Sequence, residues 1–107
     1  MLSASRRLRA SEVRDIIAKG RVLRGEYTSI KYLKKTGTSR SAVVVSKKVA
    51  KTSVLRNKVR RWVYSALRSD LLPSGIEAVV FVQKIPPTKP FSLLITDLTS
   101  LCSKQFS

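Results

Sequence analysis

Residues 53–72 follow the pattern of an amphipathic α-helix, and both faces of this helix constrain the fold. Apolar side chains recur at offsets 0, 4, 7, 8 and 11 along one side of an α-helix, namely Leu55, Val59, Trp62, Val63 and Ala66. Pro73 and Gly75 predict where this helix ends. The apolar side needs a sheet or another helix to pack against. The opposite side is polar and basic, with Asn57, Arg61, Tyr64 and Arg68 in its centre and Arg56 and Arg60 on one flank.

The flanking segments predict a sheet and two further helices. Ser11 is expected to cap a short helix that Gly20 stops. Residues 21–35 and 41–46 are rich in strand formers and are expected to form an antiparallel pair, while residues 76–82 predict a further, mostly buried strand. A last helix is expected from about Phe91 to Ser103. The predicted fold is α+β, with the order αβββαβα in a two-layer sandwich, and residues 1–107 form a single domain.

The basic charge of the chain is unevenly distributed. Lys and Arg number 22 against 6 Asp and Glu, which gives a net charge of +16. The stretch from Tyr27 to Ser69 contains no acid and holds 12 of the 22 basic residues. We therefore expect a face of one sign that needs an anionic partner, such as nucleic acid, an anionic membrane or an acidic protein.

The approach to the long helix has the chemistry of a phosphate-binding surface. Lys47, Lys48 and Lys51 precede the helix N-terminus, where free backbone N–H groups already favour anions. Arginine binds phosphate through two parallel hydrogen bonds. Without acids to form pairs, like charges at i,i+4 spacing cost about 0.2–0.5 kcal/mol per pair. A helix that carries this repulsion is expected to contact nucleic acid.

Other kinds of chemistry are poorly supported. The chain has no histidine and one cysteine, so the common zinc and copper sites and the Ser-His and Cys-His pairs are excluded. Cys102 is expected in the core, while Glu77 and Asp97 are expected at the surface. We predict no catalytic residue and no metal held by the protein. With no secretory signal or membrane span recognised, a cytoplasmic location and no membrane partner are expected.

The basic segment resembles a known family signature. Lys47-Lys48, followed by Arg56-Asn57-Lys58-Val59-Arg60-Arg61, is similar to the signature of the bacterial ribonuclease P protein subunit, commonly Arg-Asn-Arg-x-x-Arg. The resemblance implies a fold like the second domain of ribosomal protein S5, with a left-handed βαβ crossover. It also implies an RNA-binding subunit that helps a catalytic RNA remove the 5′ leader from precursor tRNA. The RNA and its Mg²⁺ ions then perform the hydrolysis, and the protein is expected as a monomer in a 1:1 ribonucleoprotein.

The same resemblance implies two sets of site residues. Contact with the catalytic RNA is expected at Lys47, Lys48, Lys51, Arg56, Asn57, Lys58, Arg60, Arg61, Tyr64 and Arg68. A groove for the leader is expected to include Val13, Ile17, Tyr27, Lys31 and Ser46. The family usually has aromatic residues where this chain has Val13, Ile17 and Lys31. Leader binding that depends less on stacking and more on charge is therefore expected.

Three other classes share part of this pattern. A ribosomal or ribosome-associated structural protein would have the same size and charge, but the Ser-Lys-Lys strand end before the Arg-Asn-Lys helix argues against it. A helix-turn-helix protein would place a helix, not a strand, directly before the basic helix. A membrane-surface helix would face lipid with its aromatic and leucine residues, whereas Trp62 lies in the stripe that the sheet needs.

Overall fold

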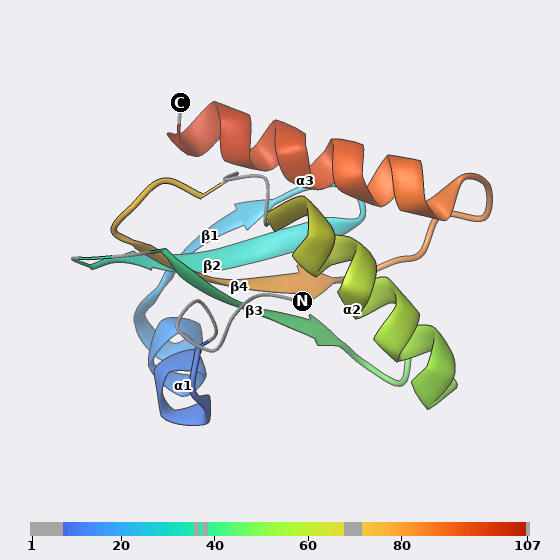
Figure 1. Ribbon diagram of the computed structural model, residues 1–107, viewed down its shortest axis with the longest axis horizontal. Coiled ribbons are helices and arrows are strands. Elements are labelled where there is room, and N and C mark those ends of the chain that lie inside the picture. The colour runs from blue at the N-terminus through green and yellow to red at the C-terminus, as the bar shows by residue number, and fades with distance from the viewer. Residues whose placement is uncertain (1–7, 36, 38, 68–71, 107) are drawn as a thin grey trace.

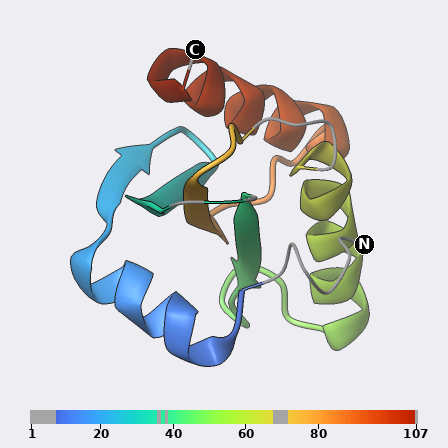
Figure 2. The same ribbon diagram turned by 60° about the vertical axis from the view of Figure 1, so that its left-hand side comes forward.

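A four-stranded sheet with helices on both of its faces forms the protein (Figure 1). The computed structural model describes residues 8–35, 37, 39–67 and 72–106. The elements in chain order are α1 (Ala10–Lys19), β1 (Arg21–Arg24), β2 (Thr28–Lys34), β3 (Arg40–Val45), α2 (Ser53–Leu67), β4 (Ile76–Val82) and α3 (Pro90–Phe106). This is the predicted order αβββαβα. Helices α2 and α3 lie on one face of the sheet and α1 lies on the other (Figures 1 and 2).

The strand order β1-β2-β4-β3 corrects one expectation from the sequence. The segments that contain β2 and β3 do not pair with each other, because β4 lies between them. β4 runs antiparallel to β2 and parallel to β3, so β3, α2 and β4 form a βαβ unit. β4 is the most apolar strand, and five of its seven residues are buried. A central position in the sheet covers more of the apolar surface of a strand than an edge position does.

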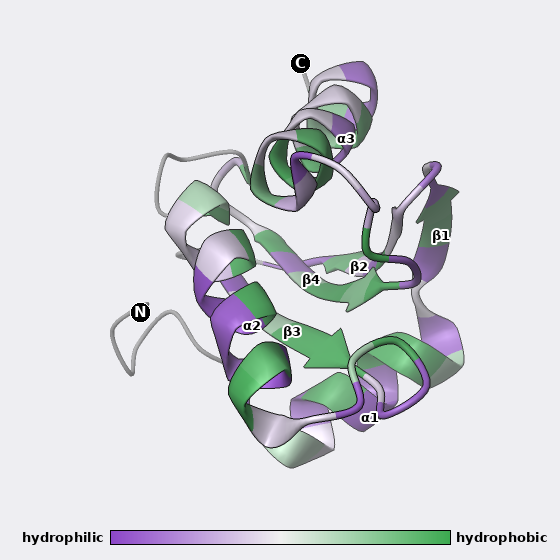
Figure 3. Cartoon of the chain, turned by 90° about the vertical axis from the view of Figure 1, so that its right-hand side faces the viewer, coloured by the Kyte–Doolittle hydropathy of each residue, from purple (hydrophilic) through white to green (hydrophobic). Residues whose placement is uncertain are grey.

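The main core lies between the sheet and the α2–α3 layer. Alternate residues of β2, β3 and β4 point to this side, including Ile30, Val43 and Val80. Val59 and Val63 of α2 meet them, as do Leu94, Leu98 and Cys102 of α3, and all five are buried. Cys102 is thus a core residue, as expected. Hydrophobic residues dominate β3 and β4 in Figure 3.

Helix α2 packs slightly differently from the predicted stripe. Its buried residues are Val59, Val63 and Leu67, which follow a spacing of four, while Leu55 is 36% exposed. The prediction that Trp62 is largely buried is wrong, since its side chain is half-buried. Its ring packs edge-to-face against Phe91 at the start of α3, with centroids 5.7 Å apart, and Phe91 is itself exposed. The predicted end of the helix, at residues 68–72, falls mainly outside the described residues.

Helix α1 begins two residues earlier than predicted. The residue before it is Arg9, and Ser11 lies inside the helix, so the expected cap at Ser11 is wrong. Glu12 determines this start, since its carboxylate accepts a hydrogen bond of 2.8 Å from the backbone N–H of Arg9. The predicted stop at Gly20 is confirmed, because its N–H donates to the carbonyl of Ile16.

Asp97 of α3 holds the turn between β1 and β2. Its carboxylate accepts hydrogen bonds from the backbone N–H groups of Glu26, Tyr27 and Thr28, and from the Thr28 hydroxyl at 2.6 Å. A Cβ atom at Gly25 would lie 2.5 Å from this carboxylate, so glycine is needed for the close approach. The expectation that Asp97 is a plain surface residue is therefore wrong.

Glu77 also departs from the surface role predicted for it. Its side chain is only 13% exposed and lies 3.8 Å from the guanidinium of Arg40. Arg40 also contacts Glu12 of α1, at 2.5 Å. The pair with Glu12 ties α1 to the sheet, and the pair with Glu77 lies within the sheet, between β3 and β4.

Candidate RNA-binding surface

The loop between β3 and α2 is a compact turn that presents its lysines to solvent. The carbonyl of Ser46, directly after β3, accepts hydrogen bonds from the N–H groups of Val49 and Ala50. Ala50 is buried and anchors the loop in the core. Lys47 and Lys48 therefore stand at an exposed tip.

Two side chains, one before the N-terminus of α2 and one in its first turn, hold the start of this helix. The Thr52 hydroxyl accepts a hydrogen bond of 3.1 Å from the N–H of Leu55, which is the role of a helix N-cap. The Arg56 guanidinium reaches back and donates to the carbonyls of Ala50 and Lys51, at 3.0 and 3.3 Å. Arg56 thus fixes the loop to the helix while it adds positive charge at the helix N-terminus.

The loop lysines 47, 48 and 51 and the polar side of α2 together form one basic surface. We call this surface the basic helix face. Lys47, Lys48, Lys51, Asn57, Lys58 and Arg61 are exposed, and Arg56 and Arg60 are half-buried. Among the described residues, the ion pairs found are those of Arg40, and none involves α2. The Lys58 ammonium lies 5.5 Å from the centre of the Trp62 ring. The face therefore carries charge that no acid of the described chain neutralises.

Two of the residues predicted for RNA contact differ from the rest. Tyr64 is half-buried, and its hydroxyl accepts a hydrogen bond of 3.2 Å from the backbone N–H of Val43. Since β3 is an edge strand, this bond satisfies a group that the sheet leaves free. Tyr64 thus has a structural partner inside the protein. Arg68 lies outside the described residues.

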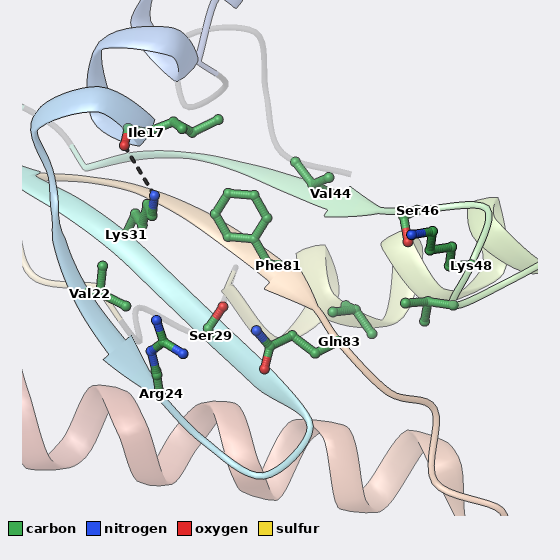
Figure 4. Close-up of a pocket in the computed structure, with 12 residues that line it drawn as sticks. Ile17, Val22, Arg24, Ser29, Lys31, Val44, Ser46, Lys48, Phe81 and Gln83 are labelled. Carbon is green, nitrogen blue, oxygen red and sulfur yellow. Dashed lines mark hydrogen bonds between the residues drawn. The ribbon is translucent and has the colours of Figure 1, made fainter.

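A second candidate surface is a groove of about 520 Å³ on the sheet face opposite α2 and α3 (Figure 4). Helix α1 packs on part of this face, against β2 and β4, and leaves the rest of it open. We call this hollow the sheet groove. Its lining residues are Ile17, Val22, Arg24, Ser29, Lys31, Val44, Ser46, Lys48, Val49, Phe81, Val82 and Gln83.

The residues predicted for the groove are only partly brought together. Ile17, Lys31 and Ser46 line it. Val13 is half-buried on α1 and is not a lining residue, and Tyr27 packs against the main core on the other side of the sheet. Val13 and Tyr27 are therefore not brought together with the other three in this groove, and leader contact at them stays a prediction.

The residues at the centre of the groove were not predicted from the sequence. Arg24, Ser29, Phe81 and Val44 are register partners on the four strands, so they form one row across the sheet. The period-two geometry of the strand at residues 76–82 contains a signal for this row. Ile76, Ala78, Val80 and Val82 face the main core, which directs Phe81 to the opposite face.

Positive charge surrounds the groove. Arg24, Lys31 and Lys48 line it, and none of its lining residues is acidic. The Lys31 ammonium donates a hydrogen bond of 3.1 Å to the carbonyl of Ile17, near the C-terminal end of α1, where a cation is favoured. Lys48 belongs to both surfaces, so the basic helix face and the sheet groove meet at the 46–49 turn.

The described residues offer little to hold a metal ion or to carry out acid–base catalysis. They contain no group of three or more Asp, Glu or Cys side chains that could bind a metal. Burial raises the pKa of the Cys102 thiol to about 11, which disfavours the reactive thiolate. No helix in this part of the chain has the length and apolar character needed to cross a membrane. The chemistry of both surfaces is that of anion binding.

Comparisons with known proteins agree on one family. The family model for ribonuclease P matches residues 2–105. A ribonuclease P protein component from Pseudanabaena is 36% identical over 109 residues, which cover 97% of this chain and 94% of that protein. The ribonuclease P protein from Thermotoga maritima has a similar structure, with a TM-score of 0.81 and 27% identity over 92% of this chain and 96% of that one. The Staphylococcus aureus protein shares the fold at the same TM-score and 16% identity, over 92% of this chain and 94% of that one.

Proposed function

This chain belongs to the ribonuclease P protein family, and we propose that its basic helix face binds the catalytic RNA while its sheet groove receives the 5′ leader of precursor tRNA. The family provides the RNA-binding protein subunit of an endoribonuclease that processes tRNA 5′ ends, with catalysis carried by the RNA. The alternative of a ribosomal structural protein is thereby set aside.

The observation that carries the proposal is the absence of acidic partners along α2. Lys58 and Arg61 are exposed, and no described acid pairs with either. A polyanion that docks here releases its counterions and relieves the repulsion between these cations. Arg56 gives the face a fixed shape, because its bonds to the loop carbonyls hold Lys51 next to the helix N-terminus.

The sheet groove is proposed for the leader because it continues from this face. A leader in the groove would lie next to the catalytic RNA at Lys48, which belongs to both surfaces. Ile17 and Val22, which are 40% and 43% exposed, provide apolar surface, and Arg24 and Lys31 provide charge for phosphates. Single-stranded RNA presents both kinds of surface.

We assign the Mg²⁺ ions of the reaction to the RNA component and the substrate. The described carboxylates do not form a group of three, and Glu12 and Glu77 are already engaged with Arg40. We propose that the protein binds and orients RNA as a monomer in a 1:1 complex, with no side chain in the reacting centre.

The test is reconstitution with the ribonuclease P RNA of the same organism and a precursor tRNA. The protein alone should not cleave, and addition of the RNA with Mg²⁺ should give cleavage at the mature 5′ end. The holoenzyme should bind the precursor more tightly than the same tRNA without its leader. Cleavage by RNA-free protein, or equal affinity for the two tRNAs, would contradict the proposed division of labour.

A further inference from the structure

Phe81 is the aromatic residue at the centre of the sheet groove. It is half-buried on β4, and its register partners on the neighbouring strands are Ser29 and Val44. Both partners have shorter side chains, so the Phe81 ring stands above the row that they form. Figure 4 shows the ring between Ile17 and Val44, with Gln83 further along the same strand.

The surroundings of this ring combine apolar side chains with a cationic rim, and a ligand must suit both. Ile17, Val22 and Val44 are three of the six exposed large apolar side chains among the described residues, and all three line this groove. Such a gathering of apolar side chains marks a binding site more often than chance exposure. The rim is cationic and lacks acids. A nucleotide fits both properties, because its base has flat apolar faces and its phosphate is anionic.

Lys31 gives this arrangement a fixed charge. Its bond to the Ile17 carbonyl holds the ammonium at the end of α1, two residues along β2 from Ser29 and therefore on the same face of the sheet as Phe81. An ammonium has three donors, and this bond uses one of them. The others remain for a phosphate or a base oxygen next to the ring.

We propose that Phe81 is the stacking platform of the groove and that it holds one unpaired nucleobase of the 5′ leader, with the flanking phosphates at Arg24, Lys31 and Lys48. This inference rests on the proposed leader groove. It goes beyond the family resemblance, which points to positions 13, 17 and 31, where this chain has no aromatic side chain. Among the described lining residues, Phe81 is the one aromatic. In this proposal the base contacts a side chain of the sheet, on β4, and not a side chain of α1.

The test is a scan of the leader with abasic sites. A fluorescent precursor tRNA with one base removed at a time is titrated with the holoenzyme, and each Kd is compared with that of the intact leader. For the unmodified protein we expect one position at which base removal weakens binding by about 5- to 150-fold, the range of a single base–aromatic stack. In Phe81→Leu, which keeps an apolar side chain without the ring, the intact precursor should bind more weakly and this abasic penalty should disappear.

Two further variants separate the ring from other effects. Phe91→Leu makes the same change on α3, on the other face of the sheet, and should keep the full penalty. Phe81→Tyr retains an aromatic face and should also keep the penalty, which separates loss of the ring from the effect of any substitution at this position. A penalty that persists in folded Phe81→Leu would overturn Phe81 as the platform and leave the leader groove standing. Equal affinity for leader-bearing and leaderless tRNA in the unmodified holoenzyme would instead overturn the groove assignment itself.

Discussion

Replacement of Asp97 by alanine should destabilise the fold far more than the loss of one exposed acid would. Four donors converge on this carboxylate, and two of them belong to Thr28, which is fully buried. The amides of Glu26 and Tyr27 lie closer to solvent, so water can replace part of their bonds. The cost is therefore expected to come mainly from the Thr28 amide and hydroxyl.

The magnitude follows from these two donors. A buried donor left without a partner costs about 1–3 kcal/mol, so Asp97→Ala should lower the free energy of unfolding by about 3 kcal/mol. In a domain of this size that corresponds to a decrease in Tm of about 10–20 °C. Domains of this kind have a total stability of about 5–15 kcal/mol, so the variant should still fold at low temperature.

The assay is urea unfolding followed by circular dichroism, with Asp15→Ala as the matched control. Asp15 is an exposed acid of α1 with no side-chain hydrogen bond or ion pair found among the described residues, so its loss raises the net charge equally. Asp97→Ala should be clearly less stable than Asp15→Ala. Equal stability of the two variants would refute the view that Asp97 fastens the β1–β2 turn to α3.

Three other changes have expected outcomes. Tyr64→Phe removes the acceptor of the Val43 N–H and should cost about 0.5–1.5 kcal/mol in urea unfolding, while RNA affinity changes little; a large loss of affinity at unchanged stability would reverse this assignment. The pKa of Glu12 is lowered from 4.5, mainly by the backbone N–H of Arg9, so its stabilisation of α1 should be complete above about pH 4.5 and be lost as the pH falls through the lower, folded pKa. Glu12→Gln should remove that pH dependence from thermal melts between pH 3 and 6, and an unchanged profile would contradict it. The Cys102 thiol, with a pKa of about 11, should react slowly with a maleimide at pH 8 until urea unfolds the chain, and fast labelling of the folded protein would argue against burial.

The sequence predicted those features of the fold that depend on local patterns. The stripe on α2, the apolar run of residues 76–82 and the stop at Gly20 each depend on residues close together in the chain, and each predicted its element. Strand order depends instead on which strand gains most from a central position. Adjacent segments were expected to pair, and only the comparison of burial on all four strands explains why β4 separates β2 from β3.

The candidate site was predictable to a similar degree. The exposed cations at 47, 48, 51, 58 and 61 follow from the absence of acids in the same stretch, which the sequence displays directly. The role of Asp97 could not be predicted, because its partners lie 69 to 71 residues away in the chain. The internal bond of Tyr64 could not be predicted for a related reason, since its partner is the free edge of β3, and which strand forms the edge is known only once the sheet is assembled.

The sheet groove also could not be predicted from local sequence patterns. Phe81 reads as one more apolar residue of a buried strand, and the alternation indicates only that it faces away from the main core. Whether that face is covered depends on the length and position of α1, which contacts β2 and β4 and leaves the row of Phe81 open. A concave site formed by four strands and a helix end has no signal in any single segment.

The most direct test of the central claim is a salt titration of binding to the ribonuclease P RNA. The double variant Lys58→Gln/Arg61→Gln removes two exposed cations of α2 that make no hydrogen bond found in the described chain, whereas Arg56 is avoided because it holds the loop. The control, Lys34→Gln/Lys104→Gln, removes the same charge from the end of β2 and the last turn of α3.

Affinity of the unmodified protein should fall steeply with salt, by about 10³–10⁵ between 50 and 200 mM if roughly 6–10 phosphates are engaged. The α2 double variant should bind more weakly and lower the slope of log K against log salt by about two units, one for each lost contact, while the control keeps the original slope. Circular dichroism should show all three proteins folded. Equal slopes and affinities for the two double variants would contradict the claim that the basic face of α2 is the principal contact with the catalytic RNA.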